Sequence, residues 1–114
     1  MKIGFIGLGN VGGKLASSLL RNKFDVTVRD LDSGLVEQFK KLGAKSAETP
    51  KELAEKVELI ITCLPSPEIC LEVMEGSSGV IEGLSENKIW LEMSTTDEHD
   101  VKRIGAKVKK WKAV

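Results

Sequence analysis

The feature that most constrains this chain is a glycine pattern placed between two periodic segments. Residues 1–6 form a short apolar run, which is typical of a buried strand. A G-x-G-x-x-G pattern follows directly at residues 7–12, and apolar side chains then recur at helical spacing through residue 21. A strand that ends in such a turn and leads straight into a helix predicts the first half of a βαβ unit.

The rest of the chain repeats this alternation of strand and helix. Pro50 and Pro67 each follow a capping residue, Thr49 and Ser66, and mark helix starts. Strands are predicted over residues 1–6, 24–28, 58–64 and 88–93, and helices over residues 10–21, 32–42, 50–57, 67–75 and 96–111. This alternation predicts the α/β class, with a Rossmann-type doubly wound parallel sheet and helices on both faces, in a single domain over residues 1–114.

Charge and composition exclude several other classes of protein. Seventeen Lys and Arg residues balance seventeen Asp and Glu residues, whereas a nucleic-acid or membrane-surface partner requires an excess of cations. No apolar run is long enough to span a bilayer, and no signal peptide is apparent. Cys63 and Cys70 form no CxxC motif and His99 is the single histidine, so we expect no metal site. These features predict a cytoplasmic protein.

Each glycine of the pattern has a separate physical task in a dinucleotide site. Gly7 makes the tight turn, Gly9 lets a pyrophosphate approach the backbone, and Gly12 lets the helix pack closely on the strand. Free N–H groups at the helix start then face the phosphates. Asp30 lies about 20 residues further on, where a carboxylate accepts hydrogen bonds from the adenosine ribose. The alternative is a structural glycine turn and an unrelated surface aspartate.

The residues around Asp30 favour NAD over NADP. A carboxylate repels the 2′-phosphate of NADP, and the next residue, Leu31, is apolar and offers that phosphate no cation. Arg29 is the complication, because its side chain could swing toward a phosphate. We therefore predict NAD as the cofactor and keep NADP as the less favoured alternative.

Four segments of the chain together resemble one known family. G-F-I-G-L-G-N-V-G, I-I-T-C-L-P-S-P-E, G-V-I-E-G-L and L-E-M-S-T-T occur in the order and spacing of the β-hydroxyacid dehydrogenases. That family includes 3-hydroxyisobutyrate dehydrogenase, tartronate semialdehyde reductase and 6-phosphogluconate dehydrogenase. The resemblance implies an N-terminal nicotinamide-cofactor domain of an oxidoreductase that transfers a hydride between the cofactor and a 3-hydroxy acid. The 6-phosphogluconate type fits less well, because it prefers NADP.

The resemblance also assigns residues beyond the glycine loop. In the family, the loop that matches Leu64-Pro65 passes along the cofactor, and the position of Thr95 contacts it near the nicotinamide; the alternatives are a strand-ending proline and a helix cap. The complete set of predicted cofactor contacts is Gly7, Leu8, Gly9, Asn10, Val11, Gly12, Asp30, Leu31, Leu64, Pro65 and Thr95.

The resemblance further implies what lies outside this chain. Family members continue with a D-A-P-V-S-G-G-like substrate loop and a helical domain that supplies the catalytic lysine and much of a dimer interface. Lys14 does not match that lysine, so we expect no catalytic residue among residues 1–114, cofactor binding without turnover, and a homo-oligomer only with the further domain. The alternative is a stand-alone Rossmann module that binds NAD as a sensor or interaction domain. The sequence does not identify the hydroxy acid.

Overall fold

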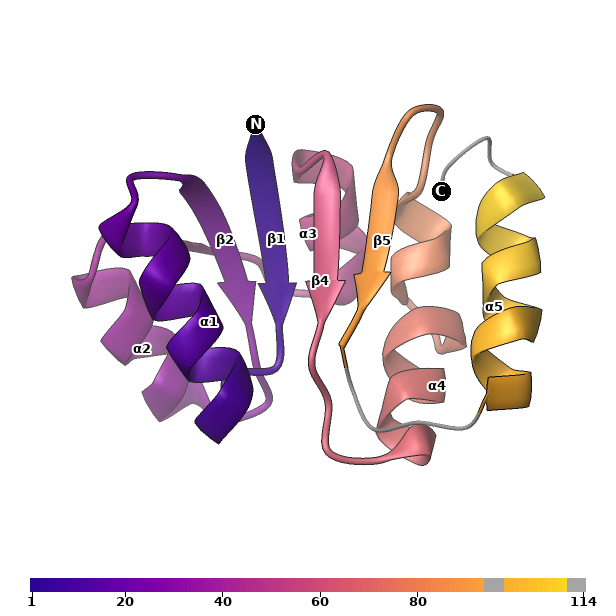
Figure 1. Ribbon diagram of the computed structural model, residues 1–114, viewed down its shortest axis with the longest axis horizontal. Helices are drawn as coiled ribbons and strands as arrows, with labels where there is room; N and C mark the ends of the chain where they lie inside the picture. The colour runs from indigo at the N-terminus through magenta and orange to yellow at the C-terminus, as the bar shows by residue number, and fades with distance from the viewer. Residues whose placement is uncertain (94–97, 111–114) are drawn as a thin grey trace.

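The computed structural model describes residues 1–93 and 98–110. Its five strands form one parallel sheet in the order β3-β2-β1-β4-β5 (Figure 1). The strands are β1 (Lys2–Ile6), β2 (Asp25–Arg29), β3 (Lys45–Ser46), β4 (Leu59–Thr62) and β5 (Ile89–Glu92). The helices are α1 (Asn10–Arg21), α2 (Ser33–Lys41), α3 (Pro50–Lys56), α4 (Pro67–Glu75), the 3₁₀ helix η1 (Val80–Gly83) and α5 (Glu98–Lys110). The predicted α/β class and parallel sheet are confirmed.

Strand β1 lies at the centre of the sheet and fixes the register on both sides. Ile3 is paired with Val26 of β2 and with Leu59 of β4. Because side chains alternate along a strand, Phe5 points to one face of the sheet and Ile6 to the other. The chain places β2 and β3 on one side of β1 and then β4 and β5 on the other side. The carboxyl ends of β1, β2 and β4 therefore lie at the point where a ligand site of this fold is expected.

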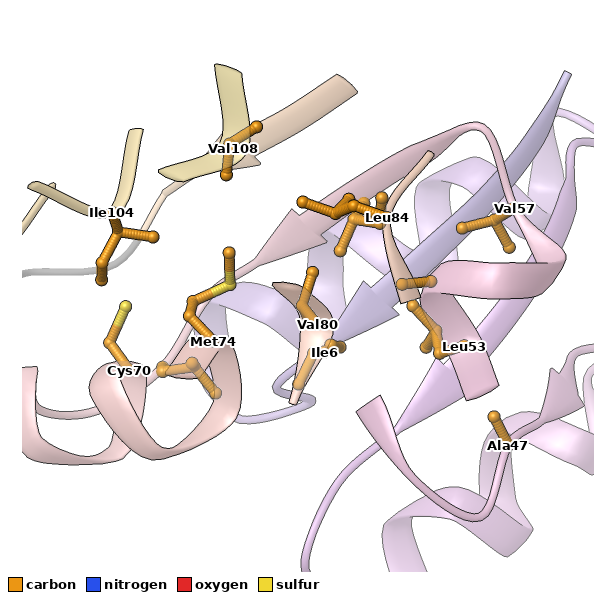
Figure 2. Close-up of a cluster of buried hydrophobic side chains, with 13 residues drawn as sticks. Ile6, Ala47, Leu53, Val57, Cys70, Met74, Val80, Leu84, Ile104 and Val108 are labelled. Atoms are coloured by element: carbon orange, nitrogen blue, oxygen red, sulfur yellow. The ribbon is translucent and has the colours of Figure 1, made fainter. Parts of the chain in front are cut away.

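Each face of the sheet is covered by its own group of helices. Helices α1 and α2 pack on the face that carries Ile3 and Phe5, around Ala16 and Phe39. Helices α3, α4 and α5 and η1 cover the opposite face, whose buried side chains are drawn in Figure 2. The buried members of that second core are Ile6, Ala47, Leu53, Ala54, Val57, Ile60, Leu64, Cys70, Met74, Val80, Leu84, Ile104 and Val108.

Helix α5 is joined to α4 by packing and by charge. Ile104 and Val108 are buried in the same core as Met74 of α4. The Glu75 carboxylate at the end of α4 accepts a hydrogen bond from Arg103 (Nη1–Oε2 2.7 Å) and forms an ion pair with Lys107. The hydrogen bond from Arg103 and then that from Lys107 lower the pKa of Glu75 to about 2, against desolvation. Arg103 and Lys107, two of the cations on α5, thus make intramolecular contacts.

The structure corrects several details of the sequence analysis. The second strand is Asp25–Arg29, one residue later than predicted, and Asp32 is the N-cap of α2 and not its first helical residue. Strand β3 has only two residues, too few for a periodic signal, and η1 was not anticipated in the glycine-rich segment. The predicted helix of residues 96–111 is described as Glu98–Lys110. In the described part of the chain, no helix has both the length and the apolar character needed to cross a membrane.

Candidate cofactor site

A hollow of about 780 Å³ opens at the carboxyl ends of β1, β2 and β4. We refer to it below as the hollow. Its walls come from the β1–α1 glycine loop, the β2–α2 turn, the β4–α4 loop and helix α4. All but two of the predicted contact residues line it, namely Gly7, Gly9, Asn10, Val11, Gly12, Asp30, Leu31, Leu64 and Pro65. Of the remaining two, Leu8 is buried in the core and Thr95 lies outside the described residues.

Two of the glycines are required by the packing of the loop itself. Gly7 has φ +103°, and a Cβ at this position would lie 2.1 Å from the Cys63 carbonyl oxygen. A Cβ at Gly12 would lie 2.0 Å from the Gly7 carbonyl oxygen. Both contacts are with backbone, which cannot give way as the end of a flexible side chain can. These two positions therefore need glycine for folding, whether or not a ligand binds.

Gly9 is different, because the fold does not require glycine there. Its backbone has φ −68° and ψ −162°, which any residue adopts, and a Cβ would meet nothing within 4 Å. Gly9 nevertheless lines the hollow, so a side chain would take up space beside the helix start. This open cradle fits a group that must approach the backbone closely, as the pyrophosphate of a dinucleotide does.

The start of α1 offers this cradle a set of backbone donors. Gly9 is the N-cap, no side chain caps the helix, and its first turn holds no acidic residue. Helical bonding begins with the Gly13 N–H, which donates to the Gly9 carbonyl (2.6 Å), so the N–H groups ahead of it belong to those that a helix leaves without an internal partner. Together with the helix dipole they favour an anion at this point.

Asp30 lines the hollow and is held by two backbone groups. Its Oδ2 accepts a hydrogen bond from the Leu8 N–H (2.7 Å), and its Oδ1 accepts one from the Asp32 N–H (2.8 Å). The same hydrogen bond gives Leu8 a place in the loop although its side chain does not line the hollow. Its N–H donates to Asp30, while its side chain is buried and only 2% exposed. Sequence spacing predicted a ribose acceptor at Asp30, but gave no sign of this link to the glycine loop.

The neighbours of Asp30 point in different directions. Leu31 is 87% exposed at the rim of the hollow. Arg29 also lines the hollow. Its Nη1 donates a hydrogen bond to the Ala47 carbonyl at 3.5 Å, a long contact that involves only a small part of the donors of the guanidinium. Val28 is buried with α1 and α2, so the alternation of β2 directs Arg29 toward the α3 side of the sheet.

Other residues of the hollow were missed by the sequence analysis. Ile69 and Val73 of α4 line it at helical i, i+4 spacing, a signal that was visible directly after Leu64-Pro65. Met93 is 45% exposed and also lines the hollow, because it follows the last paired residue of β5. Burial, and then the charge of Glu92, raise the pKa of the Cys63 thiol, which keeps this lining residue protonated.

The described residues hold no cluster of three His, Cys, Asp or Glu side chains able to bind a metal ion. The hollow presents three kinds of surface: backbone N–H groups at the start of α1, the fixed carboxylate of Asp30, and apolar side chains of α4. A phosphate, a sugar hydroxyl and a flat apolar ring match these three surfaces in turn.

Comparison with known proteins agrees with this geometry. Residues 2–114 match the family described as the NAD binding domain of 6-phosphogluconate dehydrogenase. The chain belongs to this family. It is 34% identical over 112 residues to mitochondrial 3-hydroxyisobutyrate dehydrogenase of Mus musculus, a match that covers 98% of this chain and 33% of the relative. It is 39% identical over 93 residues to 3-sulfolactaldehyde reductase of Escherichia coli, over 82% of this chain and 31% of the relative.

A solved structure confirms the fold of the family at lower sequence similarity. Psf3 in complex with NADP+ and 2-OPP superimposes with a TM-score of 0.91 at 21% identity, over 97% of this chain and 39% of that chain. The chain thus spans about a third of the length of the curated relatives it matches. It is an NAD-binding domain of the kind found in 3-hydroxyisobutyrate dehydrogenase-like oxidoreductases, as the resemblance implied.

Proposed function

We propose that this chain is the cofactor-binding part of an NAD-dependent dehydrogenase that acts on a small 3-hydroxy acid. The observation that carries the proposal is the uncapped start of α1 behind Gly9, which opens into the same hollow as the fixed Asp30 carboxylate. The bound cofactor would accept or donate a hydride. The residues of this chain bind it, orient it and shape the space around it.

The roles of individual residues follow from their surfaces. The backbone of residues 9–12 receives the pyrophosphate, and Asp30 accepts hydrogen bonds from the adenosine ribose. Leu31 with Ile69 and Val73 encloses the adenine ring. On the nicotinamide side we assign contacts to Leu64, Pro65 and Thr95, of which the first two line the hollow.

The proposed cofactor is NAD, with NADP disfavoured. The carboxylate of Asp30 stays near the ribose because both of its oxygens are held, so a 2′-phosphate would meet a negative charge that cannot turn away. Arg29 is the group that opposes this preference, and its side chain is directed toward α3.

The activity of the longer protein is proposed from its relatives. Those relatives are named for 3-hydroxyisobutyrate and 3-sulfolactaldehyde, which favours a small acid with an alcohol or aldehyde carbon as the substrate. We place the catalytic acid–base residue and most of the substrate contacts outside residues 1–114, so this chain alone binds cofactor without turnover. We retain the cytoplasm as the proposed compartment, although several relatives are named as mitochondrial.

A stand-alone NAD-binding module is the second candidate. It is favoured by the two cores, which are built within the described residues, and by the match of residues 2–114 to a family described as a binding domain. The two candidates differ in turnover. Titration of the purified chain with NADH and NADPH tests the binding, and an assay of the longer protein on a panel of 3-hydroxy acids tests the enzyme. Binding of NADH without any turnover by the longer protein would favour the module.

A further inference from the structure

The carboxylate of Asp30 joins two turns that are far apart in sequence. Its Oδ2 receives the Leu8 N–H of the β1–α1 loop, and its Oδ1 receives the Asp32 N–H of the β2–α2 turn. We propose that Asp30 is a positioning residue, which holds the glycine loop in the shape that receives the pyrophosphate before any cofactor is present. This inference rests on the proposed function for its ligand, and adds to the ribose contact a second task of the same side chain.

The Leu8 N–H is held by Asp30 at a position where the peptide cannot turn freely. The Leu8 side chain is buried among the apolar residues below α1, which fixes the direction of the peptide. The bond to Asp30 is part-buried and short at 2.7 Å, as expected for a donor that faces an ionised acceptor. On its N-terminal side, the Gly7 N–H donates to the Arg29 carbonyl (3.0 Å). The two hydrogen bonds, from the Gly7 N–H and from the Leu8 N–H, thereby hold the glycine loop against the end of β2.

An asparagine cannot reproduce this arrangement. Both oxygens of Asp30 accept from backbone donors, and an amide has one acceptor oxygen and one NH₂ donor. Whichever way the amide turned, its NH₂ group would face a backbone N–H, and one of the two bonds would be lost. Asp30→Asn therefore keeps the size of the side chain and releases one of the two turns.

Asp32 offers a matched control two residues away. It caps α2 through a single oxygen, Oδ1, which accepts from the Gly34 N–H (2.9 Å) and the Leu35 N–H (3.3 Å). The amide oxygen of asparagine can accept both bonds, and asparagine is as good an N-cap as aspartate. Asp32→Asn thus removes the same charge from the same turn without opening it.

The first experiment follows amide hydrogen exchange in the cofactor-free protein. In Asp30→Asn we expect the Leu8 or the Asp32 N–H to exchange at least 10-fold faster than in the wild type, with Ile60 of β4 unchanged as the reference for the intact sheet. In Asp32→Asn the Leu8 N–H should stay within 2-fold of the wild type. Unchanged exchange at both Leu8 and Asp32 in Asp30→Asn would overturn the proposal.

The second experiment uses reduced nicotinamide mononucleotide, which carries a phosphate but no adenosine ribose. If Asp30 positions the loop, Asp30→Asn binds this probe at least 3-fold more weakly than wild type and than Asp32→Asn. Loss of a negative charge alone would strengthen the binding of an anion, so a weakening reports on the loop. Unchanged or tighter binding of the probe would overturn the positioning role. A wild type that fails to bind NADH would refute the proposed function instead, while the exchange experiment would still decide whether Asp30 holds the loop.

Discussion

The starts of helices α1 and α2–α4 are built in opposite ways. Asp32, Thr49 and Ser66 each accept a hydrogen bond from a backbone N–H in the first turn of the helix that follows. Helix α1 has Gly9 at the same position, with no side-chain acceptor. A capping side chain contributes about 1 kcal/mol to a helix, so the chain supplies its own acceptor for three helices and omits it from the fourth.

The difference between these helix starts indicates where we expect the cofactor to bind. The uncapped helix is the one whose start opens into the hollow at the carboxyl ends of the strands, next to Asp30. We propose that the phosphates of the cofactor, and not a side chain of the protein, supply the acceptors for these donors. Glycine has two different tasks in this loop. Gly7 and Gly12 make room for neighbouring backbone, whereas Gly9 leaves open space that we assign to a ligand.

A capping side chain at the start of α1 should remove the difference between α1 and helices α2–α4. We predict that Gly9→Asp removes measurable NADH binding, a loss of at least about 3 kcal/mol, because the carboxylate would accept the α1 donors and repel the pyrophosphate. The free energy of unfolding should rise by a few tenths of a kcal/mol or stay unchanged, since aspartate caps slightly better than glycine. Calorimetric titration and urea denaturation measure the two effects. Wild-type NADH affinity in Gly9→Asp would mean that the loop is only a structural turn.

Adding one methyl group elsewhere in the loop should damage the fold instead. Gly12→Ala would place a Cβ 2.0 Å from the Gly7 carbonyl oxygen, so α1 must shift away from β1. We expect a loss of about 3 kcal/mol in the free energy of unfolding, the upper part of the range for overpacking. Gly9→Ala is the matched control, and its urea midpoint should stay close to that of the wild type. A stable Gly12→Ala protein would contradict the assigned packing role.

The choice of cofactor depends on Asp30. Asp30→Ala should weaken NADH by about 1.5–3 kcal/mol, the cost of a lost hydrogen bond to a charged acceptor, and should narrow the gap between NADH and NADPH. Fluorescence titration of both cofactors with wild type and variant measures the change. If the wild type binds NADPH as tightly as NADH, the preference for NAD is wrong.

Removing one of the ordinary caps should affect stability alone. Ser66→Ala deletes the acceptor for the Ile69 N–H, and we expect about 1 kcal/mol less stability. NADH affinity should be unchanged, because Ser66 is not among the lining residues. Thermal denaturation and a parallel titration test this pair of outcomes. A large loss of affinity would show that the start of α4 also serves the cofactor.

The smallest effect concerns the contact of α4 with α5. The pKa of Glu75 is lowered to about 2, so its ionised form stabilises the fold above the ordinary pKa of 4.5, and this contribution is lost as pH falls from 4.5 toward 2. Glu75→Gln should flatten that part of the stability–pH curve and leave NADH affinity at pH 7 unchanged. Acid unfolding followed by circular dichroism measures it. An unchanged acid transition would contradict the role of the Arg103 and Lys107 pairs.

The sequence predicted those parts of the molecule whose cause is local. Apolar runs, capping residues and proline after a cap identify four strands and all five α-helices to within a few residues. The two-residue β3 and the 3₁₀ helix η1 have no periodicity of their own and depend on packing against neighbours. The exposure of Met93 likewise depends on how the sheet ends and not on its residue type.

The site shows the same division. The glycine spacing predicted which loop lines the hollow, because Gly7 and Gly12 answer local steric demands and Gly9 leaves the helix start open. The bond between Asp30 and the Leu8 N–H joins the turns that follow two neighbouring strands, and it appears only when β1 and β2 are aligned in register. The wall formed by Ile69 and Val73 likewise depends on how α4 is placed against the sheet.

The most direct test of the account follows backbone amide resonances during a titration of the chain with NADH. The account predicts that the N–H signals of Asn10, Val11 and Gly12 show the largest shifts toward hydrogen bonding to an anion, and that those at the capped starts of α3 and α4 show no shift of this kind. NADH binding that leaves the start of α1 unchanged, or that shifts all of these helix starts alike, would contradict it.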